Sequence, residues 1–242
     1  MKKVLVLVAL VSFLTASNVF ANDAGDLMLL IEPEIGLSIP TIDLQTANVG
    51  YVSKYKGYSS TALGLEFAFQ VRAQYWFLDF LGASVGLGGR FIFDTWTFQY
   101  DGNTSAIKCG ALFTRAYLTV PFGVNFSFDA LALGAGLSLN SPLGGASALF
   151  FGENKNSKMN DGFYLNDYLG WYFDIGFNTA GKKDAGSGFG MALRLAGSLT
   201  DELGGYKWTD YGSWHNKLKY QDFSISLVFQ PTIQLVNFNS GS

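Results

Sequence analysis

Residues Ala62–Phe77 read ALGLEFAFQVRAQYWF and alternate between two kinds of side chain. Every odd position from Leu63 to Phe77 is apolar or aromatic, whereas the even positions include Glu66, Gln70 and Arg72. Successive side chains of a β-strand point to opposite faces of its sheet. The stretch therefore predicts a strand with one apolar and one polar face, whose surroundings must differ on its two sides.

Seven other segments alternate in the same way: Leu27–Ile39, Gly82–Phe98, Phe113–Phe128, Leu131–Asn140, Tyr168–Asn178, Gly188–Leu199 and Tyr220–Val236. Pro33, on the apolar side of the first, weakens that strand prediction. The expected connections alternate in length. Leu78–Leu81, Asp129–Ala130 and Thr179–Ser187 are short, whereas residues 40–60, 99–112, 142–167 and 200–219 are long and polar. This pattern predicts an all-β, eight-stranded antiparallel up-and-down transmembrane β-barrel with short periplasmic turns and long extracellular loops.

The positions of the charges predict which face meets lipid. All twelve Lys lie outside the expected strands, whereas all four Arg lie inside them and on the polar face. A strand face in water would be expected to carry Lys and Glu freely, but these polar faces consist mostly of Gly, Ala and Ser. We therefore expect the polar faces to line the lumen and the uncharged faces to contact hydrocarbon. A secreted soluble barrel or sandwich, with its apolar face inside, is the alternative.

The lumen of an eight-stranded barrel is only wide enough to be filled by side chains. Because a buried charge needs a partner, the strand arginines are expected to pair with strand carboxylates. The predicted lumen charge network is Glu32, Glu34, Glu66, Arg72, Arg90, Asp94, Arg115, Asp174, Arg194 and Asp222. Such a set can form a structural plug, which we favour, or a gated polar pathway. The glycine-rich runs 86–89 and 186–190 open no helix, so we interpret them as making room in the lumen and not as phosphate loops.

Aromatic residues near the ends of the expected strands suggest two interfacial belts. The short-turn belt would contain Tyr75, Trp76, Phe77, Phe126 and Phe128, and the long-loop belt Trp96, Phe98, Tyr100, Tyr164 and Tyr168.

The first 21 residues are expected to be a secretory signal peptide. Lys2 and Lys3 precede an apolar run, Val4–Leu14, and Val19-Phe20-Ala21 offers small residues for cleavage. The run is too short to span a bilayer as a helix, which takes about 20 residues. Residues 22–242 would then form the barrel domain.

Composition excludes several classes of function. Charged residues make up 14% of the chain and the formal net charge is −3, which does not favour nucleic acid as a partner. Cys109 and His215 are the only cysteine and histidine, so neither an internal disulfide nor a zinc site of the Cys/His kind is expected. We predict no cofactor, no metal and no catalytic residue. His215, near Ser213, Asp210 and Asp201, leaves a weaker alternative, a barrel enzyme that acts on envelope lipids.

The long loops are the expected functional surface, because loops on a rigid scaffold commonly carry binding residues. The candidate contact residues are aromatic: Tyr55, Tyr58, Phe150, Phe151, Trp208 and Trp214. They could bind an extracellular ligand or host surface, or rest on lipid headgroups.

Over residues 22 to about 236 the pattern resembles the small outer-membrane barrels of diderm bacteria, namely the OmpA transmembrane domain, OmpW and opacity-type proteins. The resemblance implies location in the bacterial outer membrane, with outer-membrane lipids and the insertion machinery as partners. It implies a non-enzymatic, structural and surface-interacting protein or, alternatively, an OmpW-like narrow channel for small hydrophobic molecules. The chain departs from these barrels near its C-terminal residues. They usually end on an aromatic residue, whereas Asn-Ser-Gly-Ser follows Phe238 here.

Overall fold

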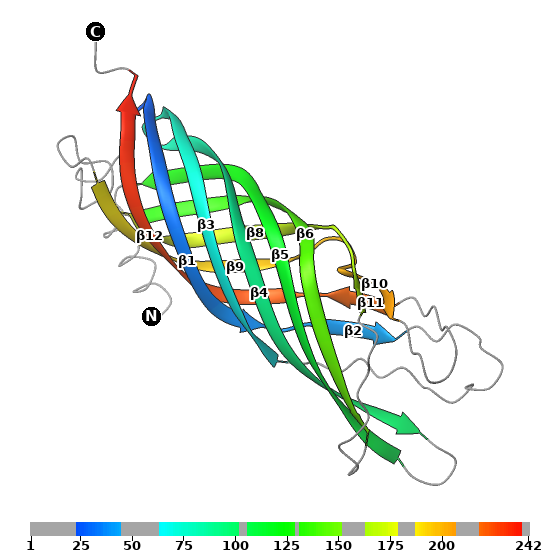
Figure 1. Ribbon diagram of the computed structural model, residues 1–242. Coiled ribbons are helices and arrows are strands. Elements are labelled where there is room, and N and C mark those ends of the chain that lie inside the picture. Colours follow the sequence, from blue (N-terminus) through cyan, green and yellow to red (C-terminus); the bar gives the residue numbers. More distant parts are fainter. Residues whose placement is uncertain are drawn as a thin grey trace, which may run out of the picture.

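The computed structural model describes residues 23–44, 63–101, 106–128, 131–151, 163–178, 187–206 and 218–238. Eight long strands close into one barrel in the order β1-β12-β9-β8-β6-β5-β4-β3 (Figure 1). They are β1 (Asp26–Ser38), β3 (Leu63–Leu78), β4 (Leu81–Asp101), β5 (Ala106–Phe128), β6 (Leu131–Phe151), β8 (Tyr168–Asn178), β9 (Ser187–Ser198) and β12 (Phe223–Asn237). Every neighbouring pair is antiparallel. The predicted eight-stranded antiparallel barrel is confirmed.

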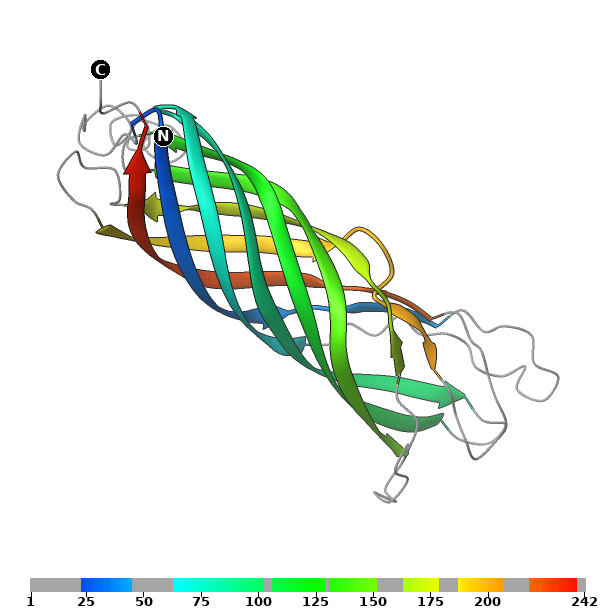
Figure 2. The same ribbon diagram turned by 45° about the horizontal axis from the view of Figure 1, so that its top comes forward.

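Four short strands lie beyond one end of the barrel. β2 (Thr41–Leu44) pairs with β11 (Leu218–Gln221), and β7 (Phe163–Leu165) pairs with β10 (Leu203–Tyr206). β1 begins and β12 ends at the opposite end (Figures 1 and 2). We call the end where β1 begins the short-turn end, and the end near the four short strands the outer mouth.

The loops predicted at 99–112 and 142–167 are too long, because strand continues through part of each. β4 runs to Asp101, β5 begins at Ala106 and β6 reaches Phe151. These three strands extend beyond the wall as an antiparallel arm, visible in Figure 2. The register of β5 and β6 shifts between Ala116 and Tyr117, where Gly144 has a φ of +156°. This bulge breaks the period-two pattern on which the sequence prediction depended.

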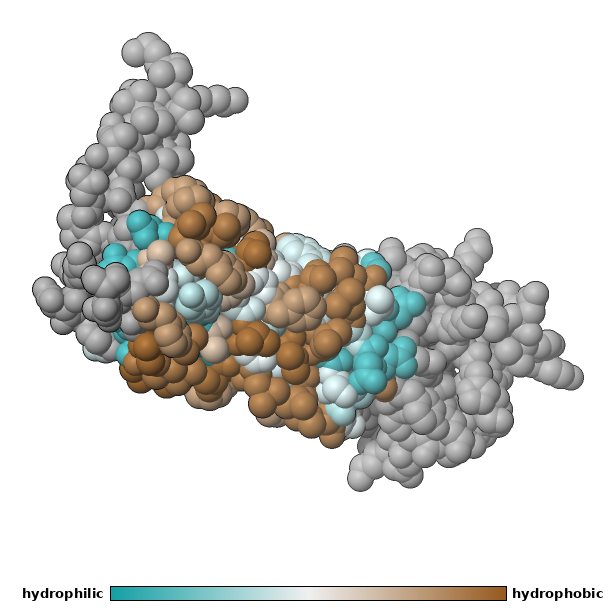
Figure 3. Space-filling view, turned by 90° about the horizontal axis from the view of Figure 1, so that it is seen from above, coloured by the Kyte–Doolittle hydropathy of each residue, from teal (hydrophilic) through white to brown (hydrophobic). Residues whose placement is uncertain are grey.

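The outer face of the barrel is apolar, as Figure 3 shows for one side. Leu87, Leu193 and Phe69 are each between 45% and 56% exposed, whereas the inward-facing Arg72, Glu32 and Asp94 are at most 1% exposed. In a water-soluble barrel these two environments would be exchanged. The chain is therefore a transmembrane barrel of the outer-membrane type. Among the residues that the structure describes, no helix is long and apolar enough to span a membrane.

Two of the predicted belt residues point into the lumen. Trp76 is 3% exposed and packs on Met28 and Leu30 at the short-turn end. Tyr168 is 2% exposed and packs with Ile92 and Tyr117 near the outer mouth. The belt assignment is wrong for these two residues, because each occupies an inward position in its strand. The two side chains help to fill the lumen instead of lying at an interface.

Placing a charge on the outer face should destabilise the barrel according to its depth in the membrane. We expect Leu87→Lys, near the middle of β4, to cost about 2–4 kcal/mol of folding free energy in lipid vesicles. Leu81→Lys, on the same face of β4 at the short-turn end, should cost about 0–1 kcal/mol. Urea titrations of both variants in vesicles would measure the two costs. Equal losses would contradict the assignment of this face to hydrocarbon.

Candidate functional site

The barrel lumen is the candidate functional site, because it contains the buried charges. The structure places all ten residues of the predicted charge network inside it, none more than 7% exposed. They separate into two groups along the barrel. The inner tier consists of Glu32, Glu34, Arg72, Asp174 and Arg194. The outer tier consists of Glu66, Arg90, Asp94, Arg115 and Asp222, together with Glu202, which the sequence analysis did not include.

Arg194 organises the inner tier. Its Nε and Nη2 atoms donate to the two oxygens of Asp174 at 2.7 and 2.8 Å. Its Nη1 atom donates to Glu34 Oε2 at 2.8 Å, and Nη2 lies 3.3 Å from Glu32 Oε2. Arg72 Nη2 lies 2.7 Å from the same Glu32 oxygen. The tier therefore links β1, β3, β8 and β9 across the lumen.

Tyr172 stands between the two inner arginines. The guanidinium carbons of Arg72 and Arg194 lie 5.0 and 5.2 Å from the centre of its ring, within the range of a cation–π contact. Two glycines provide the space that the Tyr172 hydroxyl occupies. A Cβ atom on Gly123 or Gly136 would lie 2.5 or 2.6 Å from this oxygen. These glycines make room for a lumen tyrosine.

Gly86 and Gly88, which belong to the first of the two glycine runs singled out in the sequence, also leave space that a side chain would fill. A Cβ atom on Gly88 would lie 2.3 Å from the Phe69 carbonyl oxygen and 2.7 Å from Gln70. One on Gly86 would lie 2.8 Å from the Val71 carbonyl oxygen. The prediction that these residues make room in the lumen is confirmed at both positions.

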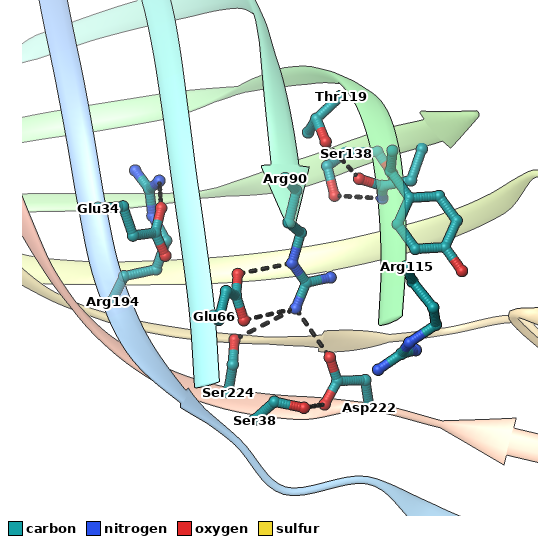
Figure 4. A network of polar contacts seen from close by, with 12 residues as sticks. Glu34, Ser38, Glu66, Arg90, Arg115, Thr119, Ser138, Arg194, Asp222 and Ser224 are labelled. Atoms are coloured by element: carbon teal, nitrogen blue, oxygen red, sulfur yellow. Dashed lines mark hydrogen bonds and ion pairs between the residues drawn. The ribbon is translucent and has the colours of Figure 1, made fainter. Parts of the chain in front are cut away.

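Arg90 organises the outer tier (Figure 4). Its Nε and Nη2 atoms donate to the two oxygens of Glu66 at 2.6 and 2.8 Å, and Nη2 also donates to Asp222 Oδ2 at 2.9 Å. Its Nη1 atom donates to the Tyr168 hydroxyl. Bidentate pairs of this kind fix the orientation of a guanidinium as well as its charge.

Arg115 contacts Asp94 and Glu202, so the outer tier continues to the mouth of the barrel. Glu202 belongs to the connection between β9 and β10, and its exposed fraction is 0%. Burial raises the pKa of the Glu202 carboxyl to about 7, although the neighbouring Arg115 opposes that shift. Residue 202 lies within the predicted loop 200–219, where no period-two pattern can indicate that a side chain faces the lumen.

Ser38 bridges two carboxyl groups of the outer tier. Its Oγ atom lies 2.9 Å from Asp94 Oδ1 and 2.8 Å from Asp222 Oδ1. A hydroxyl has one proton and can donate to only one of these oxygens at a time. Ser38 of β1 therefore connects Asp94 of β4 to Asp222, which precedes β12, through one hydroxyl group.

A small cavity separates the two tiers. Its volume is about 30 Å³, and its lining includes Glu34, Glu66, Gln70, Arg90, Tyr172 and Arg194. That volume has room for about two water molecules. Within the described part of the chain, no group of three or more His, Cys, Asp and Glu residues is arranged to hold a metal ion.

The predicted loop contacts cannot be placed beside this lumen. Tyr55, Tyr58, Trp208 and Trp214 lie outside the described residues, as do His215 and the predicted signal peptide. The backbones of Phe150 and Phe151 belong to β6, but the structure does not describe their side chains.

No family model and no curated protein sequence matches this chain. Solved outer-membrane barrels are similar to it in fold. OprG from Pseudomonas aeruginosa is 14% identical with a TM-score of 0.43, and the match covers 89% of this chain and 99% of OprG. The outer membrane protein AlkL is 14% identical, with a TM-score of 0.40 and coverage of 91% and 95%. The outer membrane protease OmpT from Escherichia coli is 8% identical, with a TM-score of 0.42 and coverage of 87% and 97%.

The space around Tyr172 gives a test of how tightly the lumen is packed. We expect Gly136→Ala to lower the free energy of unfolding by about 1–3 kcal/mol, as overpacked cores do. Its Cβ atom would lie 2.2 Å from the Phe122 carbonyl oxygen, which cannot move without distorting the wall. Gly134→Ala, two residues away on the same face, meets nothing closer than 3.3 Å and should cost less. Urea unfolding in detergent would compare the two variants, and equal losses would contradict this account.

Proposed function

We propose that this protein is a non-enzymatic integral outer-membrane protein whose lumen is closed and whose interactions are made by its extracellular side. One observation carries the proposal: each lumen arginine contacts carboxylates from two different segments of the chain. Arg194, for example, joins Glu34 of β1 to Asp174 of β8. Breaking such a buried pair leaves a charge without a partner inside the barrel, which costs about 3–5 kcal/mol. The pairs of Arg72, Arg90 and Arg194 therefore act as a fixed plug.

Apolar caps at both ends of the described lumen support the same function. Trp76, Met28 and Leu30 fill the short-turn end, and Ile92, Tyr117 and Tyr168 lie near the outer mouth. The charged side chains between them are engaged in ion pairs, which leaves little for catalysis or for guiding ions. Binding would then fall to the extracellular loops, with outer-membrane lipids around the wall and an extracellular ligand or host surface as the partner.

Planar-bilayer recordings test whether the lumen is a plug. We expect no resolved conductance steps from the wild type or from Leu87→Ala, which alters only the outer face. Arg90→Ala combined with Arg194→Ala removes the cross-lumen bridge of each tier and should produce conductance steps. Steps from the wild type that change in Arg90→Ala alone would overturn the plug and favour a gated polar pathway.

A second candidate function, a conduit for small hydrophobic molecules, is supported by the seam between β1 and β12. Their register lacks pairs between Leu30↔Thr232 and Glu34↔Val228. Continued through this gap, the register sets Pro33 opposite Phe229 and Pro231 opposite Ile31. Proline has no amide proton, so each removes one donor from the ladder. The seam is thus weakest near the middle of the wall, where a small apolar molecule could pass sideways into lipid.

Locking the seam with a disulfide tests the conduit. Leu29→Cys with Ile233→Cys, in a Cys109→Ala background, would clamp β1 to β12 at a paired position beside the gap. For a conduit, uptake of a hydrophobic fluorescent probe into cells should fall in the oxidised variant and recover with reductant. Leu139→Cys with Leu169→Cys clamps the fully paired β6–β8 ladder as a control. Equal uptake in oxidised and reduced forms of the β1–β12 variant would exclude this seam as a route.

A further inference from the structure

Residues 199–202 cross the outer mouth between β9 and β10 and insert one charged side chain into the lumen. The Glu202 carboxylate contacts Arg115 and accepts a hydrogen bond from the Ser198 hydroxyl. The Tyr117 hydroxyl donates to it at 3.4 Å. The Glu202 carboxyl group is carried by a connection at the mouth of the barrel and not by a strand of its wall. A side chain that is buried from such a connection can also leave without opening the wall.

The backbone of this segment is held by a few bonds to β8 and to the residues just before it. The Asn166 amide donates to the Glu202 carbonyl oxygen at 2.8 Å, and the Leu199 amide donates to the Leu169 carbonyl oxygen at 2.8 Å. The Thr200 hydroxyl accepts from the Leu169 amide at 2.9 Å. These bonds lie at the edge of the barrel, and Thr200 and Leu199 are exposed. The segment can therefore detach locally while the strand ladders remain paired.

Burial favours the neutral form of Glu202, and the nearby Asp222 adds to this effect, although Arg115 and Arg90 favour the charged form. Arg115 and Tyr117 of β5, Arg90 and Asp94 of β4, Tyr168 of β8 and Asp222 before β12 surround it. Arg115 is already paired with Asp94, and the outer tier has four carboxyl groups for two guanidinium groups. An ionised Glu202 would be the second carboxylate on one guanidinium in a space without bulk water. When Glu202 is exposed to the outside medium, its carboxylate is hydrated and no longer shares the Arg115 guanidinium with Asp94.

We propose that the 199–202 segment is a latch over the outer mouth, closed while Glu202 holds a proton and released when Glu202 ionises. Release would expose Arg115 and the outer tier to the extracellular medium without disturbing the inner tier. The latch is separate from the proposed binding function of the loops and from the β1–β12 seam, so it can fail while both of those stand.

The pKa shift of Glu202 sets the direction and the range of the response. In the closed state the pKa is about 7, whereas an exposed glutamate has its ordinary value of 4.5. Between these two values the closed state binds more protons than the open one. Raising the pH through this range therefore favours opening, by up to about tenfold per pH unit for one proton. Above pH 7 both states are ionised and the equilibrium levels off.

Amide hydrogen exchange of the protein in lipid nanodiscs tests the latch. Protection factors, corrected for the intrinsic pH dependence of exchange, would be measured for peptides covering 163–169 and 198–203 from pH 5 to 8. In the wild type they should fall by up to about tenfold per pH unit and then level off above pH 7. Peptides from the middle of β8 and β12 should show no such change.

Glu202→Gln keeps the shape of the protonated side chain and should remain protected at every pH tested. Asp201→Asn removes the neighbouring carboxyl group, which is not part of the lumen network, and should retain the wild-type profile. The heat-modifiable gel shift would show that each variant forms a closed barrel. A wild-type profile without pH dependence, or the same dependence in Glu202→Gln, would overturn the latch. If Glu202→Gln does not fold, the wild-type profile alone decides.

Discussion

The pairing of buried guanidinium groups with carboxylates is the constraint on which the rest of this barrel depends. Hydrocarbon surrounds the wall and side chains fill the lumen, so bulk water does not hydrate a charge there. Such a charge must be neutralised by an opposite charge inside the barrel. Each of the four arginines contacts acidic side chains from two segments of the chain. Some of these pairs join strands that are not neighbours in the sheet, such as β9 and β1. The lumen therefore fixes the cross-section of the barrel as well as its charge.

Small residues on the inner faces leave the room that the paired, long polar side chains need. A long inward side chain can lie over the neighbouring strands only where they have no Cβ atom in the way. Gly136 of β6 and Gly123 of β5 provide such a place for Tyr172, and Gly88 of β4 does so for Gln70. The high glycine content of the chain is thus a consequence of filling a narrow lumen with long polar side chains.

Much of the architecture could be predicted from the alternation of side chains, because period two determines which residues share a face. It placed Arg72, Glu32 and Asp174 on the inner side of the wall, where the structure has them. Period two does not determine which residues on that face meet across the lumen, since partners such as Arg194 and Glu34 are 160 residues apart. The period-two pattern also gives no information about residues outside strands, so it could not identify Glu202 as a lumen residue.

Two errors in the sequence predictions have a common physical origin. Trp76 and Tyr168 were assigned to interfacial belts because aromatic residues at strand ends are frequent there. Their inward positions in β3 and β8 take precedence, because a residue two places along a strand must stay on the same face. The lumen ends need bulky apolar side chains as much as the interfaces do. At the ends of a barrel strand, the period-two position of a residue therefore predicts its face better than its aromatic character does.

The two tiers differ in their ratio of carboxyl to guanidinium groups, and this difference suggests different roles. The inner tier has three carboxyl groups for two guanidinium groups and is covered at the short-turn end by Trp76 and Met28. The outer tier has four carboxyl groups for two guanidinium groups, and one of these carboxyl groups, that of Glu202, is carried by the connection at the outer mouth. Burial raises the pKa of the Glu202 carboxyl group to about 7. A change in pH should consequently act on the mouth of the barrel and leave the inner plug closed.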